Sequence, residues 1–211
     1  MEIKYLKLNQ TYTSPTKIKP RYIVVHSTAV GLTNRMTLFN AWNNPSVKLS
    51  CHGMVDDKGC TLTLPPDYKG WHVGSRGNDL SIGFEICEPP FIAYLDAAHT
   101  KVDTSKYNPK DPKVRADFEK RWKNAVKMAA YLCSETGIDP KYVLCHAEMF
   151  VIERATNHGD VVHWFNLFGE RYYMDYFRAQ VKRELEKQAQ AGKTKPKTIR
   201  RTVRRHMDVK Q

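Results

Sequence analysis

The fold is decided by the stretch Tyr22-Ile23-Val24-Val25-His26, in which four apolar or aromatic residues lead directly into a histidine. Such a short run, rich in β-branched and aromatic residues, predicts a buried strand with His26 at its carboxyl end. The same pattern returns in Tyr142-Val143-Leu144-Cys145-His146. If these two strands are neighbours in one sheet, both imidazoles lie at the same edge.

A third polar group follows the second histidine. Asp160 lies fourteen positions after His146, in the loop motif Asn157-His158-Gly159-Asp160. Two strand-end histidines and a carboxylate suit zinc, which with three protein ligands keeps a fourth position for water and lowers the pKa of that water to about 7. The sequence therefore predicts a zinc site made of His26, His146 and Asp160.

Two neighbouring residues compete for these roles. Thiolates bind zinc well, but successive side chains on a strand point to opposite faces, so only one of Cys145 and His146 can face the site. His158 lies two residues before Asp160 on the same loop. Spacing alone leaves the choice between His158 and Asp160 open.

Further strand patterns complete a sheet. Residues 51–55 and 60–64 flank the polar turn Asp56-Asp57-Lys58-Gly59, which predicts a β-hairpin. Residues 80–87 read as another buried strand, except that Glu85 lies in its interior. A carboxylate inside a buried strand costs free energy unless it is paired, so Glu85 is a candidate functional residue.

Helical patterns alternate with these strands. Apolar residues recur at helical spacing from Thr33 to Trp42 and from Pro112 to Gly137, and residues 164–168 and 172–185 suggest a closing helical segment. Residues 88–112 contain four prolines and predict a long irregular loop of the kind that shapes a groove. The expected fold class is α/β, a single domain with a central mixed β-sheet flanked by α-helices.

Charge divides the chain unevenly. Residues 180–211 hold eleven Lys or Arg against three Asp or Glu, which accounts for +8 of the formal net charge of +12. We therefore expect a folded domain over residues 1–179 and a basic helical extension with a flexible tail over 180–211, with little stable structure beyond Ala189. Nucleic-acid recognition would interleave aromatic residues with the basic ones, and none follows Phe177.

Cysteine spacing and hydropathy describe the expected environment. The five cysteines include no C-x-x-C pair, which favours reduced, buried thiols over a disulfide framework. No apolar run approaches the roughly 18 residues of a membrane span, and the first seven residues lack the apolar core of a signal peptide. We expect a protein made in the cytoplasm without an export signal of its own.

Several short motifs carry a resemblance to a known family. They are Val24-Val25-His26-Ser27-Thr28, Cys51-His52-Gly53-Met54-Val55, Gly70-Trp71-His72-Val73-Gly74, Asn78-Asp79-Leu80-Ser81-Ile82-Gly83-Phe84-Glu85, and Cys145-His146-Ala147-Glu148 with the later Asn157-His158-Gly159-Asp160. In this order they resemble the zinc-dependent type-2 N-acetylmuramoyl-L-alanine amidases, which include lysins and peptidoglycan recognition proteins. Within that family, Asn157-His158-Gly159-Asp160-Val161 followed by His163-Trp164 is similar to phage endolysins of Gram-positive hosts.

The resemblance implies a peptidoglycan amidase that, as an endolysin, acts on the host wall after release from the cell. It implies Zn²⁺ on His26, His146 and Asp160, and attack of activated water on the amide between N-acetylmuramic acid and L-alanine. Glu85 would take the proton of the water and return it to the leaving amine. His158, which stands where catalytic relatives usually carry a Lys, would stabilise the oxyanion or orient Asp160.

The same resemblance suggests substrate contacts from the glycine-flanked residues 71 and 72 and from residue 78 after that segment. Trp71, His72 and Asn78 are the candidates, although Trp71 as a core residue and His72 as a loop hydrogen-bonding group are equally compatible with the sequence. His52 is expected to be structural. Cys51 stands where many relatives have a Tyr, and the spacing from His146 to Asp160 exceeds that of many relatives.

Two other functions compete with the amidase. A peptidoglycan-binding module without activity would share the fold, although the presence of all three ligands and Glu85 argues against it. A basic zinc protein that binds nucleic acid would depend on residues 190–211. For the basic tail itself, a linker to a wall-binding module or an anchor to anionic wall polymers or lipids is favoured over a nucleic-acid patch.

Overall fold

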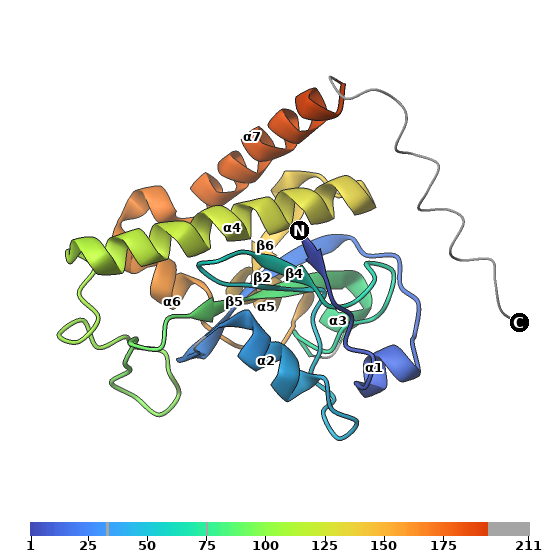
Figure 1. The fold of residues 1–211 in the computed structure, drawn as a ribbon, viewed down its shortest axis with the longest axis horizontal. Coiled ribbons are helices and arrows are strands. Elements are labelled where there is room, and N and C mark those ends of the chain that lie inside the picture. The colour runs from blue at the N-terminus through green and yellow to red at the C-terminus, as the bar shows by residue number, and fades with distance from the viewer. Residues whose placement is uncertain (33, 75, 194–211) are drawn as a thin grey trace, which may run out of the picture.

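A mixed β-sheet forms the centre of the protein in the computed structural model (Figure 1). Within residues 1–32, 34–74 and 76–193, which the structure describes, the sheet has six strands in the order β1-β4-β3-β5-β2-β6. The strands are β1 Glu2–Ile3, β2 Tyr22–Gly31, β3 Gly53–Val55, β4 Cys60–Leu62, β5 Ser81–Glu88 and β6 Val143–Cys145. Strands β3, β5, β2 and β6 run parallel, whereas β4 is antiparallel to β3. The carboxyl ends of β2, β5 and β6 therefore meet at one edge.

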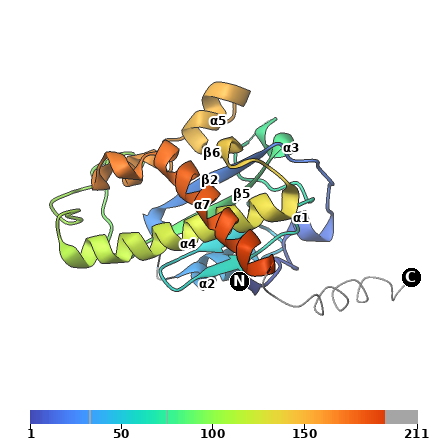
Figure 2. The ribbon, with the colours of Figure 1, turned by 90° about the horizontal axis from the view of Figure 1, so that it is seen from above.

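Helices cover both faces of this sheet. They are α1 Gln10–Thr13, α2 Arg35–Trp42, α3 Gly77–Leu80, α4 Pro112–Thr136, α5 His146–Glu153, α6 Val162–Phe165 and α7 Met174–Lys193. Three 3₁₀ turns lie at Pro140–Tyr142, Asn166–Phe168 and Glu170–Tyr172. Helix α4 crosses one face with α7 packed against it, and α2 lies on the other side of the sheet (Figures 1 and 2).

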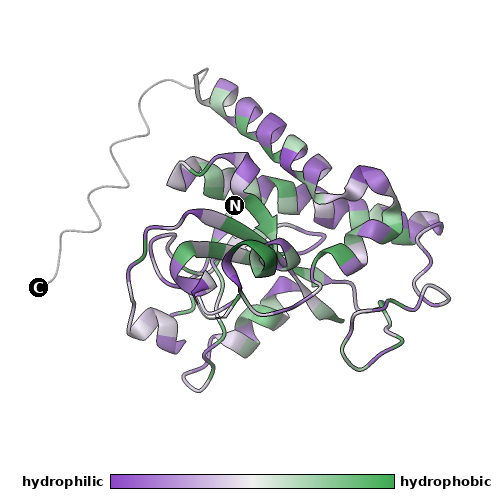
Figure 3. Cartoon of the chain, turned by 180° about the vertical axis from the view of Figure 1, so that it is seen from behind, coloured by the Kyte–Doolittle hydropathy of each residue, from purple (hydrophilic) through white to green (hydrophobic). Residues whose placement is uncertain are grey.

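Alternation along β2 decides which residues face which layer. Ile23 and Val25 pack with Phe118 and other residues of α4 in the main core, whereas Val24 belongs to a smaller cluster with Met149 of α5. Figure 3 shows the central strands as apolar and the length of α7 as largely hydrophilic. Because successive side chains on a strand alternate, His26 lies on the face opposite α4.

These features confirm the predicted fold class, a single α/β domain with a mixed sheet between helices. The predicted hairpin is present as antiparallel β3 and β4, and its turn is held by the Asp56 carboxylate, which accepts hydrogen bonds from the backbone of Lys58 and Gly59. The predicted long loop holds no helix or strand between Glu88 and Pro112, apart from an isolated bridge between Tyr94 and Val102.

Two local predictions were wrong. Strand β2 does not end at His26 but continues to Gly31, because Gly31 still pairs with Glu88 of β5 after a register irregularity. His146 does not follow β6 as a free strand end but opens helix α5, whose first turn is capped by the Glu148 carboxylate accepting from the Cys145 N–H at 3.0 Å. Both histidines nevertheless lie at the same sheet edge.

At the carboxyl-terminal end, helical structure continues a few residues beyond the predicted limit. Helix α7 continues to Lys193, past the expected limit at Ala189, and the predicted domain boundary between residues 179 and 180 lies inside it. The predicted tail beyond residue 193 lies outside the described residues. All five cysteines are unpaired thiols, as predicted. In the part of the chain that the structure describes, no helix has the length and apolar character needed to cross a membrane.

Candidate metal and catalytic site

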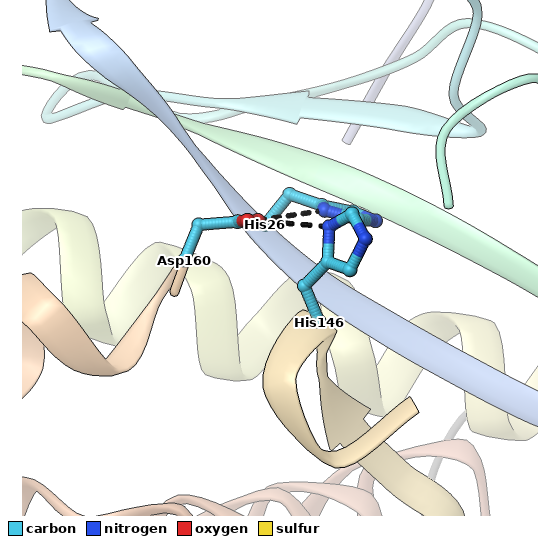
Figure 4. Close-up of side chains that lie close together, drawn as sticks. All are labelled: His26, His146 and Asp160. Atoms are coloured by element: carbon cyan, nitrogen blue, oxygen red, sulfur yellow. Dashed lines mark hydrogen bonds and ion pairs between the residues drawn. The ribbon is translucent and has the colours of Figure 1, made fainter. Parts of the chain in front are cut away.

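Three predicted ligands converge at the carboxyl edge of the sheet. His26 comes from β2, His146 from the start of α5 and Asp160 from the loop before α6, and their side chains point toward one another (Figure 4). Asp160 Oδ2 lies 2.8 Å from Nδ1 of His26, and Asp160 Oδ1 lies 3.2 Å from Nδ1 of His146. The candidate ligand atoms of the three residues all lie within 4.8 Å of one another.

Backbone contacts hold this group in place. The His146 N–H donates to the carbonyl of Asp160 at 3.1 Å, which ties the long loop to the start of α5. His26 pairs in register with Glu85 of β5 and directly follows Val25, the last residue of β2 that pairs with β6. The three side chains are buried, so their positions are set by packing and not by solvent.

The charge state of the group suits a divalent cation. Burial alone would raise the pKa of Asp160, but hydrogen bonds and charge from His146 and His26 hold it well below its usual range. Burial lowers the pKa of His26 in spite of the nearby carboxylate, so its imidazole is neutral at neutral pH. Deprotonated carboxylate and neutral imidazole are the forms that bind metal, so these residues fit Zn²⁺.

Glu85 lies beside this group without a counter-charge. It pairs in register with His26 across β5 and β2, it is 9% exposed, and among the described residues its Oε2 has no hydrogen-bond partner. Burial, reinforced by the carboxylates of Asp160 and Glu88, raises the pKa of Glu85 well above its usual value. A buried carboxyl group with a raised pKa in a cleft is a candidate proton carrier.

The raised pKa of Glu85 predicts a pH-dependent gain in stability for Glu85→Gln. Since the folded pKa exceeds the unfolded one, the folded protein binds the extra proton and loses stability as pH rises above about 4.5, the usual value. We expect metal-free Glu85→Gln to melt above wild type at pH 8, where each 1 kcal/mol gained raises Tm by about 2–4 °C. The difference should shrink toward pH 4. Calorimetry of both proteins checks it, and an equal Tm at pH 8 would contradict the raised pKa.

A cleft of about 740 Å³ borders these buried groups. Its lining includes His26, Glu85, His146 and Asp160, together with His158 and with His99 from the long loop. A second hollow of about 360 Å³ adjoins the first, since Lys48 and Trp71 line both. The surface thus offers a groove that extends beyond the metal group, as a polymeric substrate requires.

The residues predicted to contact substrate differ in their exposure to solvent. Trp71 is 48% exposed at the rim of the cleft, which excludes the core interpretation. Asn78 is buried, and its Oδ1 accepts hydrogen bonds from the backbone of His72 and Val73, both at 3.0 Å. Asn78 therefore holds this segment, and a direct contact of Asn78 with substrate stays a prediction.

His158 and the rival ligands have distinct positions. The ring of His158 is exposed and stacks on that of His146, with centroids 4.8 Å apart and planes at 13°. Cys145 packs in the main core, away from the converging group, and burial raises the pKa of its thiol to about 12. His52 Nδ1 accepts from the Gly83 N–H at 3.1 Å, and burial lowers the pKa of His52 to about 4, as a structural histidine requires.

Sequence reasoning missed two contacts to the candidate ligands. Thr156 Oγ1 lies 2.9 Å from Nε2 of His146, and no motif or periodicity marks Thr156 as special. His72 was predicted to meet substrate, yet its Nδ1 lies 2.9 Å from Nε2 of His26. Both contacts join segments far apart in sequence, which local patterns do not reveal.

The fold and the site define a class, an α/β domain that can hold one metal ion beside a buried carboxyl group in an open cleft. The family model described as N-acetylmuramoyl-L-alanine amidase, Amidase_2, matches residues 16–160. The chain therefore belongs to the N-acetylmuramoyl-L-alanine amidase family, as its motifs predicted, and this membership supports amide hydrolysis in peptidoglycan.

Solved structures share this fold. A mutant endolysin from Bacillus subtilis is 24% identical, with a TM-score of 0.58, over 85% of this chain and 97% of that one. The catalytic domain of XlyA is 23% identical, with a TM-score of 0.58, over 85% and 97%. The Staphylococcus aureus hydrolase AmiA, in complex with its ligand, is 20% identical with a TM-score of 0.66 over 90% and 84%. A search among curated proteins finds no match.

Proposed function

We propose that this protein is a zinc-dependent amidase that cleaves the bond between the lactyl group of N-acetylmuramic acid and L-alanine. The observation that carries the proposal is the buried group of His26, His146 and Asp160, with Glu85 in the same cleft. When bound, Zn²⁺ supplies a Lewis acid that polarises the scissile carbonyl and lowers the pKa of water. With three protein ligands, the fourth coordination position of the zinc would be open to water or substrate.

Two further side chains have defined tasks in this proposal. Glu85 accepts the proton of the attacking water and delivers it to the nitrogen of the departing L-alanine, since its unpartnered oxygen is free to bind that proton. His158 is exposed in the cleft and donates an N–H to the oxyanion that develops on the carbonyl oxygen. Trp71 at the rim offers an apolar face to the sugar or the stem peptide.

The biological setting we propose is lysis of a host wall by a phage or prophage endolysin after release from the cytoplasm. The motif from Asn157 to Trp164 supports it, as does the shared fold with a Bacillus subtilis endolysin. The basic residues beyond Gln180 would then add attraction to anionic wall polymers.

A free-amine assay on purified Gram-positive walls tests the proposal. An amidase releases new L-alanine amino termini and clears the suspension, and addition of a chelator stops both. A protein that sediments with the walls and releases no amine would instead be a binding module. Tight, salt-sensitive binding to DNA without any action on walls would favour a nucleic-acid protein.

A further inference from the structure

Both histidines of the metal group have the same pattern of contacts. Nδ1 of each faces the Asp160 carboxylate, whereas Nε2 of each faces a neighbouring polar side chain. For His26 that neighbour is Nδ1 of His72 at 2.9 Å, and for His146 it is Oγ1 of Thr156 at 2.9 Å. When a metal occupies Nδ1, the proton of each ring lies on Nε2, and the second partner of each histidine must accept it.

The hydroxyl proton of Thr156 is already engaged in a hydrogen bond. Its hydroxyl donates to the carbonyl of Val73 at 3.0 Å, and the Thr156 N–H donates to the same carbonyl at 3.0 Å. A hydroxyl has a single proton, so toward His146 the Thr156 oxygen can only accept. Thr156 therefore supplies an acceptor for a proton on Nε2 of His146, which is where that proton must lie once Nδ1 gives its lone pair to a metal.

His72 can supply the same kind of acceptor to His26. A metal bound to Nδ1 of His26 requires the proton on Nε2, and that proton has His72 Nδ1 as its acceptor. The proton of His72 is then on its own Nε2. That nitrogen is buried and has no hydrogen-bond partner among the described residues.

Close packing keeps the segment of His72 and Val73 in this position. A Cβ atom at Gly83 would lie 2.6 Å from His72 Nδ1, and one at Gly74 would lie 2.5 Å from Thr156 Cγ2, so only glycine fits at either place. Asn78 holds the backbone N–H groups of this segment from the other side. The contacts to both histidines thus depend on one tightly seated piece of chain.

We propose that His72 and Thr156, the latter through the Val73 carbonyl, are positioning residues that hold His26 and His146 with the proton on Nε2 and the Nδ1 lone pair toward the metal. This inference rests on the proposed zinc site. Partners of this kind, which hold a ligand histidine in one tautomer, commonly contribute about 10–100-fold in metal affinity.

Thr156 allows a matched pair of variants. Thr156→Val keeps the shape of the side chain and removes the hydroxyl, whereas Thr156→Ser keeps the hydroxyl. By competition with a chromophoric chelator, we expect Thr156→Val to bind Zn²⁺ about 10–100-fold more weakly than wild type. Thr156→Ser should bind close to wild type. Thermal unfolding of each metal-free variant checks that the fold is intact.

His72 supplies an independent pair and a direct readout. His72→Gln retains an oxygen that can accept from His26, and His72→Leu does not, so Zn²⁺ affinity should fall more in His72→Leu. In the zinc-loaded protein, NMR of the imidazoles should show the Nε2–H proton of His146 protected from exchange with water in wild type and Thr156→Ser. Thr156→Val should lose that protection.

The results separate this inference from the proposed function. If wild type binds Zn²⁺ and both Thr156→Val and His72→Leu bind it equally well, the positioning role is overturned while the zinc site stands. If wild type binds no Zn²⁺, the zinc site and the inference fail together. A weaker affinity in both variants, restored by Ser and Gln, supports it.

Discussion

Glu85→Gln is expected to lower the turnover of wall amide hydrolysis by about 10²–10⁴-fold, the usual cost of losing a general acid–base group. Gln has nearly the same shape as Glu but cannot take up or return a proton at neutral pH. Because Glu85 is not one of the three candidate ligands, Zn²⁺ content should stay at the wild-type level. Release of L-alanine amino termini gives the turnover, and elemental analysis gives the metal.

Glu88 provides a control on the same strand. It is also buried, but its carboxylate is engaged by the Tyr94 hydroxyl and by His163 Nε2, and it does not line the cleft. Glu88→Gln should therefore lower thermal stability more than turnover. Wild-type turnover in Glu85→Gln, or an equal loss in both variants, would remove Glu85 from the mechanism.

Local periodicity was enough to predict the elements that position the site. The apolar runs before His26 and His146 read as strands because four successive β-branched, aromatic or aliphatic residues suit a sheet buried on both faces. Parallel pairing of β2 with β6 then places both histidines at one edge. The stripe of α4 from Pro112 to Thr136 was equally readable, since a proline opens it and Gly137 ends it.

Contacts between distant segments were not predictable in the same way. The Oδ1 of Asn78 accepts from backbone N–H groups five and six residues earlier, a role that the sequence did not predict, while its predicted contact with substrate stays a prediction. Thr156 reaches Val73 across 83 positions, and a single sequence contains no period or spacing that marks such a pair. Tertiary hydrogen bonds of this kind are resolved only by coordinates.

The start of α5 shows a second limit of prediction from sequence. The run from Tyr142 to Cys145 has strand character, but Glu148 lies three residues after Cys145 and caps a helix there, so His146 takes its direction from a helix and not from a strand. The capping signal was present in Cys145-His146-Ala147-Glu148, but a Cys at the cap position is a weak signal compared with Ser or Thr. The consequence for the site is small, because His146 still faces Asp160.

Asp160→Asn is expected to abolish Zn²⁺ binding and reduce wall hydrolysis to background. The carboxylate of Asp160 contacts both candidate histidines, so its loss removes the one negative ligand and the group that aligns the other two. A chelator should produce the same loss in wild type, and added Zn²⁺ should restore wild type but not the variant. Elemental analysis and the free-amine assay on the same samples measure both effects.

His158→Gln tests the competing assignment of the third ligand. His158 stacks on His146 from the exposed side and lies outside the set of atoms that converge within 4.8 Å, so its removal should leave Zn²⁺ bound. Turnover should still fall, since the proposed oxyanion donor is lost, and the loss should appear mainly in kcat. Cys145→Ala, on the opposite face of β6, should keep both metal and activity. Metal retained in Asp160→Asn but lost in His158→Gln would make His158 the third ligand in place of Asp160 and remove it as the proposed oxyanion donor.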